Sequence, residues 1–206
     1  MSALAPTLEA FFTQRLVAQR NASPHTIAAY RDCFRLLLGY LTATKGIPPA
    51  KLDFADLDAK VIAGFLEHLE TERNVTISTR NARLAAIHSL FRFAAVRHPE
   101  HAQLIARVLD IPTKRTKRAT VTYLTRPEIE ALLGAPDISV RIGRRDRALL
   151  LVATQTGLRV SELTNLRRCD VALDAGAHLA CTGKRPQATS HAALPPDRLG
   201  AQGVAR

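Results

Sequence analysis

The stretch Thr156-Gly157-Leu158-Arg159-Val160-Ser161-Glu162-Leu163 decides how the second half of this chain folds. An apolar run from Ala148 to Ala153 leads into it, and Gly157 is placed to end a helix as a left-handed cap. A second amphipathic segment begins at once, so Arg159 lies in a tight corner between two predicted helices. The corner has two interpretations. It is a generic helix-turn-helix connection with a surface arginine, or it is a phosphate site, because a guanidinium binds phosphate oxygens through two parallel hydrogen bonds.

The chain is strongly basic. Its 206 residues carry a formal net charge of +11, with a sequence pI near 10.4, and 47% of them are hydrophobic. This hydrophobic fraction supports a folded core, and the length fits one large domain or two small ones. The charge favours a polyanionic partner, DNA or RNA rather than a membrane, and a basic surface that only confers solubility is the open alternative.

The three cysteines, Cys33, Cys169 and Cys181, are widely spaced and form no CxxC pair. This pattern argues against a disulfide framework and a zinc site, and it suits a reducing compartment. No apolar run approaches the ~18 residues of a membrane span, and the N-terminus lacks the basic and apolar regions of a signal peptide. We therefore expect a cytoplasmic protein with no metal site and no membrane partner.

The first hundred residues have the pattern of short helices joined by polar breaks. Helix starts are predicted at Ser23 with Pro24, at Asp56 or Asp58, and at Thr76 or Ser78. A further short helix is expected over residues 102–109. Apolar residues recur at helical spacing within the main segments, and such stripes pack antiparallel helices into a compact bundle. They are Leu8, Phe11, Phe12, Leu16, Ile27, Tyr30, Phe34, Leu37, Leu38, Leu41, Ile62, Phe65, Leu66, Leu69, Leu84, Ile87, Phe91 and Ala94.

Residues 112–120, Pro-Thr-Lys-Arg-Thr-Lys-Arg-Ala-Thr, contain no large apolar side chain, and we place the domain boundary here. Lys114, Arg115, Lys117 and Arg118 put four positive charges into five residues. These charges repel one another unless a polyanion lies alongside. The segment is either a solvated linker or a linker that follows a phosphate backbone.

The second half opens with a predicted capping box, in which Thr125 and Glu128 begin a helix that ends at Gly134. The apolar helix that leads to Gly157 follows. Two short strands, 171–173 and 178–182, are expected around a turn. Residues 185–206 have few aliphatic side chains, in no period, among prolines and glycines, and are expected to be disordered.

The octet at 156–163 resembles the first arginine motif of the tyrosine recombinases (phage integrases), which reads TGLR, then a hydrophobic residue, Ser or Gly, Glu and Leu. The resemblance covers roughly residues 5–184. Residues 23–30 (SPHTIAAY) look like the second helix of the family's small domain, and 76–84 (TISTRNARL) are similar to its DNA-facing fourth helix. Residues 123–133 resemble the opening helix of its catalytic domain.

The resemblance implies a mainly α fold with a SAM-like, core-binding DNA-binding domain over residues 1–111 and a basic linker over 112–120. The first part of an α+β catalytic domain would cover 121–184. The implied partners are double-stranded DNA and other recombinase protomers. Arg80 and Arg83 share a helical face at i, i+3, and are expected to bridge adjacent phosphates or to form a solvated surface pair. The residues expected at DNA are His25, Thr26, Thr79, Arg80, Arg83, Lys114, Arg115, Lys117 and Arg118.

Complete members of the family rejoin DNA through a phosphotyrosine bond, without a metal or a nucleotide. Two arginines hold the scissile phosphate, a lysine on a β-hairpin protonates the leaving oxygen, a His-x-x-Arg box and a further His or Trp assist, and a tyrosine attacks. Preorganised cations stabilise such a transition state by ~2.7–4 kcal/mol per donor. By this resemblance Arg159 is the first arginine, and Glu162 is the family's acidic partner, which buttresses the fold rather than acting on the substrate. Lys184 is the candidate general acid, unless it is a flexible surface lysine.

The rest of the catalytic set is missing from the sequence. No His-x-x-Arg follows Lys184, and the tyrosines, Tyr30, Tyr40 and Tyr123, all precede Arg159. We therefore expect this chain to bind DNA without cleaving it alone. The family pattern stops abruptly after Lys184, which suggests a frameshift as the origin of the tail.

Three functional hypotheses follow from these observations. The chain is a site-specific recombinase by descent that cannot cleave alone, or a stand-alone DNA-binding module that competes with a full-length recombinase. The third is an unrelated basic nucleic-acid binder, for instance of RNA. Loss of duplex binding on replacing Arg80 and Arg83 by Ala would favour the second over the third.

Overall fold

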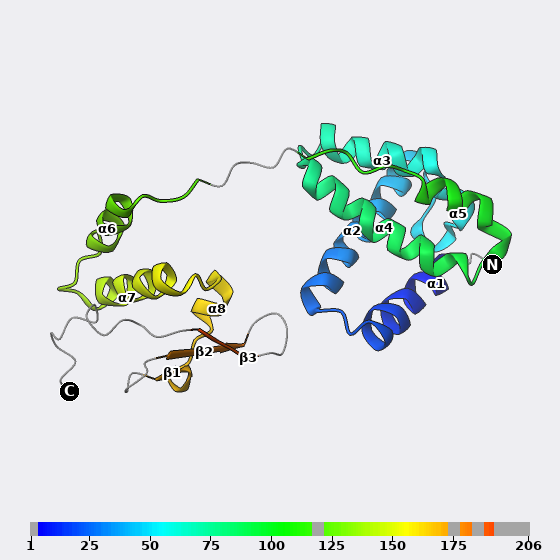
Figure 1. Cartoon of the computed structure of the whole chain (residues 1–206). Coiled ribbons are helices and arrows are strands. Elements are labelled where there is room, and N and C mark those ends of the chain that lie inside the picture. The colour runs from blue at the N-terminus through cyan, green and yellow to red at the C-terminus, as the bar shows by residue number, and fades with distance from the viewer. Residues whose placement is uncertain (1–3, 117–121, 173–177, 183–187, 192–206) are drawn as a thin grey trace. The chain divides into compact units, whose positions relative to one another are not determined.

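The computed structural model describes residues 4–116, 122–172, 178–182 and 188–191. It is mainly helical and carries one small sheet, as the sequence predicts (Figure 1). The chain divides into two compact units, residues 1–119 and 120–206. No described helix is both long enough and apolar enough to cross a membrane.

The first unit is a bundle of helices. Its helical segments are α1 (Leu4–Ala10), which continues into a π-helical stretch (Phe11–Gln19), α2 (Pro24–Lys45), α3 (Ala59–Thr71), α4 (Ile77–Ala95) and α5 (Ala102–Leu109). Single 3-10 turns lie at Pro49–Lys51, Phe54–Asp56 and Pro99–His101. The short helix over 102–109 is thus confirmed.

Side-chain caps begin these helices where the sequence predicts them. Ser23 accepts a hydrogen bond from the Thr26 backbone at 3.3 Å and is followed by Pro24. Between the two predicted caps of α3 the structure selects Asp58, whose carboxylate accepts the backbone N–H of Val61 at 2.8 Å. Thr76, rather than Ser78, caps α4 through the Thr79 N–H. Caps of this kind contribute about 1 kcal/mol each.

Phe11 lies at the centre of the core of the first unit. Its fully buried ring contacts the rings of Phe12, Tyr30, Phe34 and Phe93 at centroid distances of 5.7, 6.2, 6.1 and 5.6 Å. Because these partners come from the first helical stretch, α2 and α4, one side chain joins three segments. Such aromatic pairs add about 0.5–1.5 kcal/mol beyond the area that they bury.

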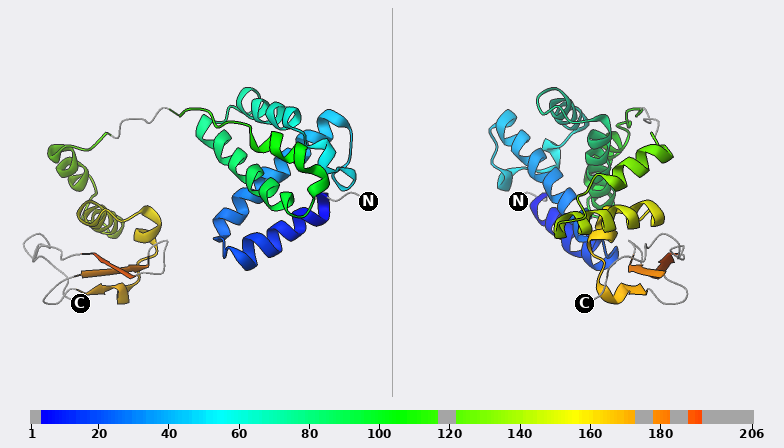
Figure 2. Two further views of the ribbon diagram at one scale, coloured as in Figure 1. Left: turned by 45° about the vertical axis from the view of Figure 1, so that its right-hand side comes forward. Right: turned by 90° about the vertical axis from the view of Figure 1, so that its left-hand side faces the viewer.

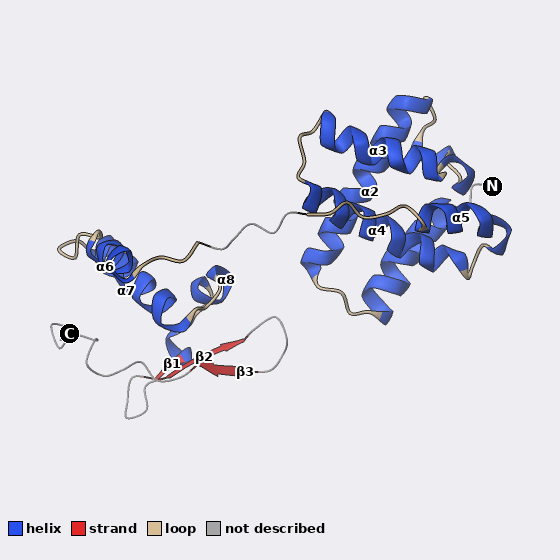
Figure 3. Ribbon diagram, turned by 45° about the horizontal axis from the view of Figure 1, so that its top comes forward, coloured by secondary structure: helices blue, strands red, loops and turns tan. Residues whose placement is uncertain are grey.

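The segment after α5 runs back along α4 towards its first turn (Figure 3). His88 of α4 places Nε2 3.0 Å from the Val108 carbonyl oxygen, so that nitrogen must carry the donated proton. Burial lowers the pKa of the His88 imidazole, which favours its neutral form. Two turns nearer the helix start, Arg80 reaches the carbonyl of Pro112. This path brings the basic segment back to the beginning of α4.

The second unit combines three short helices with an antiparallel sheet of order β1-β2-β3 (Figure 2). Its elements are α6 (Arg126–Gly134), α7 (Arg141–Thr156), α8 (Val160–Thr164), a 3-10 turn (Arg168–Asp170), β1 (Val171–Ala172), β2 (His178–Thr182) and β3 (Ala188–His191). The predicted capping box is confirmed, because Glu128 accepts both the backbone N–H and the hydroxyl of Thr125. Both bonds favour the ionised carboxylate, so the pKa of Glu128 is lowered.

The expectation of disorder from residue 185 onwards is wrong for residues 188–191. They form β3 and pair with β2 in the register Leu179 to His191 and Thr182 to Ala188. This strand is not predictable from its own residues, because Ala, Thr, Ser and His do not alternate apolar and polar side chains. Backbone pairing with a neighbouring strand supplies the order that side-chain pattern does not.

The second unit has a thin apolar core. Leu158 and Leu179 are its buried pair, with Val152, Leu163, Leu166 and Val171 packed against them. Large apolar side chains stay exposed, namely Tyr123, Leu124, Leu132, Ile138, Val140, Ile142 and Val160. Apolar residues of α7 and the α8 region line an open hollow of about 430 Å³. Hydrophobic stabilisation grows with buried area, so the described residues of this unit supply much less of it than those of the first unit.

Candidate functional site

Arg159 lies at the corner between α7 and α8. Gly157 ends α7 in the left-handed conformation, with φ 65°, and its N–H donates to the Ala153 carbonyl at 3.0 Å. The predicted cap is therefore confirmed. Arg159 follows in extended conformation as the residue before α8, and its side chain is 76% exposed. A rigid corner thus presents a guanidinium to solvent.

Glu162 holds Arg159 in place from one turn into α8. One carboxylate oxygen accepts the Arg159 backbone N–H at 2.8 Å, and the other accepts a guanidinium N–H at 3.0 Å. The Glu162 side chain is only 12% exposed, whereas its partner is open to solvent. Because the Glu162 carboxylate binds both the backbone N–H and the guanidinium of Arg159, it limits the rotamers of this side chain. Further guanidinium N–H donors remain for an anion.

Lys184, the candidate general acid, lies outside the described residues. The strands on either side of it, β2 and β3, are antiparallel neighbours. The sequence showed no return strand for a hairpin at this point, and β3 provides one. The role of Lys184 stays a prediction.

Arg80 does not face solvent beside Arg83. Its side chain is 7% exposed, its guanidinium donates to the Pro112 carbonyl at 3.1 Å, and its Nε lies 3.8 Å from the Glu70 carboxylate. The expectation of an exposed pair that bridges phosphates is wrong for this residue. The reason is helical geometry: Arg80 precedes Leu84 by four residues and continues the buried stripe of α4.

Arg83 is half-buried where α4 crosses α2. The thiol of Cys33 donates to the Arg83 carbonyl, with sulfur and oxygen 3.5 Å apart. Burial raises the pKa of Cys33 to about 11, and the neighbouring Arg83 charge only partly opposes this effect. The thiol is therefore protonated near neutral pH, and it has no electrostatic feature of a reactive cysteine.

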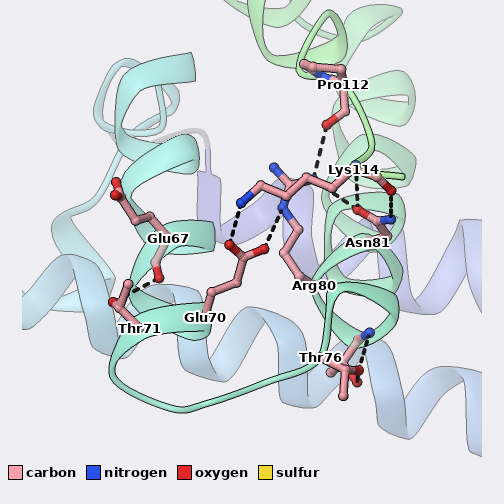
Figure 4. A network of polar contacts seen from close by, with 9 residues as sticks. Glu67, Glu70, Thr71, Thr76, Arg80, Asn81, Pro112 and Lys114 are labelled. Atoms are coloured by element: carbon pink, nitrogen blue, oxygen red, sulfur yellow. Dashed lines mark hydrogen bonds and ion pairs between the residues drawn. The ribbon is translucent and has the colours of Figure 1, made fainter. Parts of the chain in front are cut away.

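Lys114 is bound to the bundle through its backbone and its side chain. Asn81 accepts the Lys114 N–H at 3.1 Å and donates to its carbonyl at 2.7 Å, and the Lys114 ammonium contacts Glu70 (Figure 4). Its expected role at DNA conflicts with this engagement, because the ammonium already has a carboxylate partner. Glu70 and Asn81 were not predicted, since no sequence pattern relates residues 33 and 44 positions apart.

Besides Lys114, four of the predicted DNA contacts are exposed in this structure. His25 and Thr26 lie in the first turn of α2, Thr79 lies in the first turn of α4, and Arg115 follows Lys114. The contact between Cys33 and Arg83 places the first half of α2 against the first half of α4. The exposed first turns of both helices lie on the N-terminal side of this contact. Lys117 and Arg118 lie outside the described residues. In the part of the chain that is described, no three His, Cys, Asp or Glu side chains are grouped as a metal site requires.

Comparison with known proteins assigns both units. Residues 10–98 match the family "Phage integrase, N-terminal SAM-like domain", and residues 122–193 match the "Phage integrase family". The second match runs past Lys184, at which the family pattern was expected to stop.

Among relatives, the integrase/recombinase y4rC of Sinorhizobium fredii is 54% identical over 183 residues, covering 89% of this chain and 55% of that protein. The tyrosine recombinase XerC of Pelobacter propionicus is 33% identical over 178 residues, covering 84% of this chain and 54% of that protein. This chain thus spans about half the length of these relatives.

Among solved structures, XerH site-specific recombinase bound to palindromic difH substrate has a TM-score of 0.60 and 20% identity. The alignment covers 84% of this chain and 49% of XerH, and it shows a shared fold. Together with the two family matches and the octet around Arg159, these relatives show that the chain belongs to the tyrosine recombinase (phage integrase) family.

Proposed function

We propose that this chain binds double-stranded DNA through its helical unit and the basic segment that follows it, and that it does not cleave DNA alone. The observation that carries the proposal is the arrangement at the start of α4. Thr79 is exposed there, and the Lys114 N–H is bound to Asn81 two residues further along α4, so a cation-rich segment begins beside a helix N-terminus. Backbone N–H groups of such a turn and neighbouring cations are ordinary phosphate ligands.

Net charge and family support the same proposal. A charge of +11 produces a long-range attraction for a polyanion. The solved relative XerH is bound to a DNA substrate, and this chain shares its fold. We propose residues 1–111 as the DNA-binding domain, 112–120 as the linker and 121–184 as part of a catalytic domain.

A direct test is fluorescence anisotropy with a short labelled duplex at low salt, where wild type is expected to bind. Replacing Arg115 by Ala is expected to weaken binding about fivefold, the equivalent of ~1 kcal/mol for one charge-assisted contact. Lys51→Ala is the matched control: Lys51 is exposed, and the neighbouring Phe54 packs on Phe91 and His98 at the other end of α4. Absence of wild-type affinity at low salt would exclude the proposal.

In the second unit, we propose that Arg159 binds a DNA phosphate and that Glu162 orients it. The exposed guanidinium on a corner fixed by Gly157 supports this role. The resemblance of residues 156–163 to the family's first arginine motif implies that this arginine holds the scissile phosphate in complete members. All three tyrosines of the sequence precede Arg159, so the proposed role of Arg159 is phosphate binding alone.

Arg159→Ala is expected to weaken duplex binding about fivefold and to reduce the dependence of log K on log salt by about 0.9. Arg126→Ala removes an equally exposed arginine, also paired with a glutamate, from the same unit and serves as the control. Equal losses in both variants would mean that only the net charge matters, and would contradict a specific role for Arg159.

A further inference from the structure

Residues 112–114, which lead out of the bundle, are held on α4 by hydrogen bonds between α4 side chains and their own backbone. Asn81 forms a reciprocal pair with Lys114, accepting its N–H at 3.1 Å and donating to its carbonyl at 2.7 Å. Arg80 donates to the Pro112 carbonyl at 3.1 Å. Three backbone groups of a segment without helix or strand are thereby bound to two adjacent residues of α4 (Figure 4).

Ion pairs with a carboxylate of α3 add to the same contact. Glu70 lies between Arg80 and Lys114, with one carboxylate oxygen towards each cation. The Arg80 and Glu70 side chains are 7% and 20% exposed, so neither charge is well hydrated. A buried charge is strongly unfavourable without a partner, so the two side chains require each other. Lys114 adds a second cation at the more exposed side.

We propose that Glu70, Arg80 and Asn81 form a clasp that fixes residues 112–114 on the bundle and so positions the basic segment for DNA. The three are positioning residues, because their polar groups face the protein rather than solvent. The inference rests on the DNA-binding function proposed above. It also moves the start of the free linker from residue 112 to Arg115.

The clasp has a thermodynamic reason. A free segment loses conformational entropy when it is ordered on a duplex, and that loss subtracts from affinity. In this chain the folded bundle already orders residues 112–114. The free part of the basic segment therefore begins at Arg115, next to the first turn of α4, where Thr79 is exposed.

Asn81→Ala tests the clasp without changing charge. The amide of Lys114 is expected to exchange with solvent at least about tenfold faster than in wild type, because its acceptor is removed. The amide of Ile87 in the core of α4 should keep its wild-type rate, which shows that the bundle is folded. DNA affinity should fall by about three- to fivefold, through the added ordering cost.

Glu70→Gln and Glu67→Gln separate positioning from net charge. Both variants remove one negative charge from α3, and Glu67 lies one turn from Glu70 with an exposed side chain and no ion pair among the described residues. Only Glu70→Gln is expected to accelerate exchange of the Lys114 amide. Equal behaviour of the two variants would overturn the proposal.

Two further results would also overturn it. If the Lys114 amide in Asn81→Ala exchanges as slowly as in wild type, the contacts do not hold the segment. If it exchanges faster while DNA affinity is unchanged, the clasp does not position the segment for DNA. Failure of wild type to bind any duplex is a different outcome, which rejects the proposed function while exchange still measures the clasp.

Discussion

Replacing Phe11 by Ala is expected to lower the free energy of unfolding of the first unit by about 3–5 kcal/mol, the range for a large aromatic side chain removed from a core. The ring is fully buried and contacts four other aromatic rings, so neighbouring side chains cannot collapse into the space without losing their own contacts. An effect of this size is a large part of the stability of a small domain.

The measurement can be confined to the first unit. The chain has no tryptophan and three tyrosines, and in a Tyr123→Phe background only Tyr30 and Tyr40 fluoresce. Tyr30 stacks on Phe11, so its emission during a urea titration reports the relevant core. Val17→Ala is the control, because Val17 follows in the same helical stretch but is 54% exposed, and less than about 1 kcal/mol is expected. Similar losses in the two variants would show that Phe11 is not the centre of the core.

Raising salt fourfold, from about 50 to about 200 mM, is expected to weaken duplex binding about 500-fold. Each neutralised phosphate contributes about −0.9 to the slope of log K against log salt, and about five contacts give a slope near −4.5. The five cations proposed for these contacts are Arg83, Arg115, Lys117, Arg118 and Arg159. Lys114 is left out because it pairs with Glu70.

The slope is obtained from anisotropy titrations at several salt concentrations with the full chain. Arg115→Ala should reduce its magnitude by about 0.9, whereas Lys51→Ala should leave it unchanged. A slope near zero in wild type would contradict binding through phosphates, even if the affinity itself were high.

Local signals in the sequence predicted the helix boundaries well. Ser23, Thr76 and the Thr125–Glu128 box act within one turn, and Gly157 needs only its own left-handed conformation, so short-range chemistry determines each of them. The sequence leaves the cap of α3 open between two aspartates and the cap of α4 open between Thr76 and Ser78, because both residues fit the pattern in each case. Only the packed structure selects Asp58 and Thr76.

Long-range contacts were not predictable in the same way. Spacing alone placed Arg80 with Arg83, but its equally valid i, i+4 relation to Leu84 puts it inside the bundle. A buried arginine requires a carboxylate, and nothing in the sequence identifies Glu70 as that carboxylate. β3 was missed for a related reason, since its order comes from pairing with β2 rather than from its own side chains.

Two segments that follow each other in the chain hold residues 112–114. Glu70 lies at the end of α3, Arg80 and Asn81 lie at the start of α4, and the held residues follow only after α5 has returned along α4. An incompletely folded bundle therefore carries all its cations but lacks the assembled contacts that hold residues 112–114. Under the function proposed above, DNA engagement would require a correctly folded bundle, and a destabilising change deep in the core would misplace the charges of the basic segment.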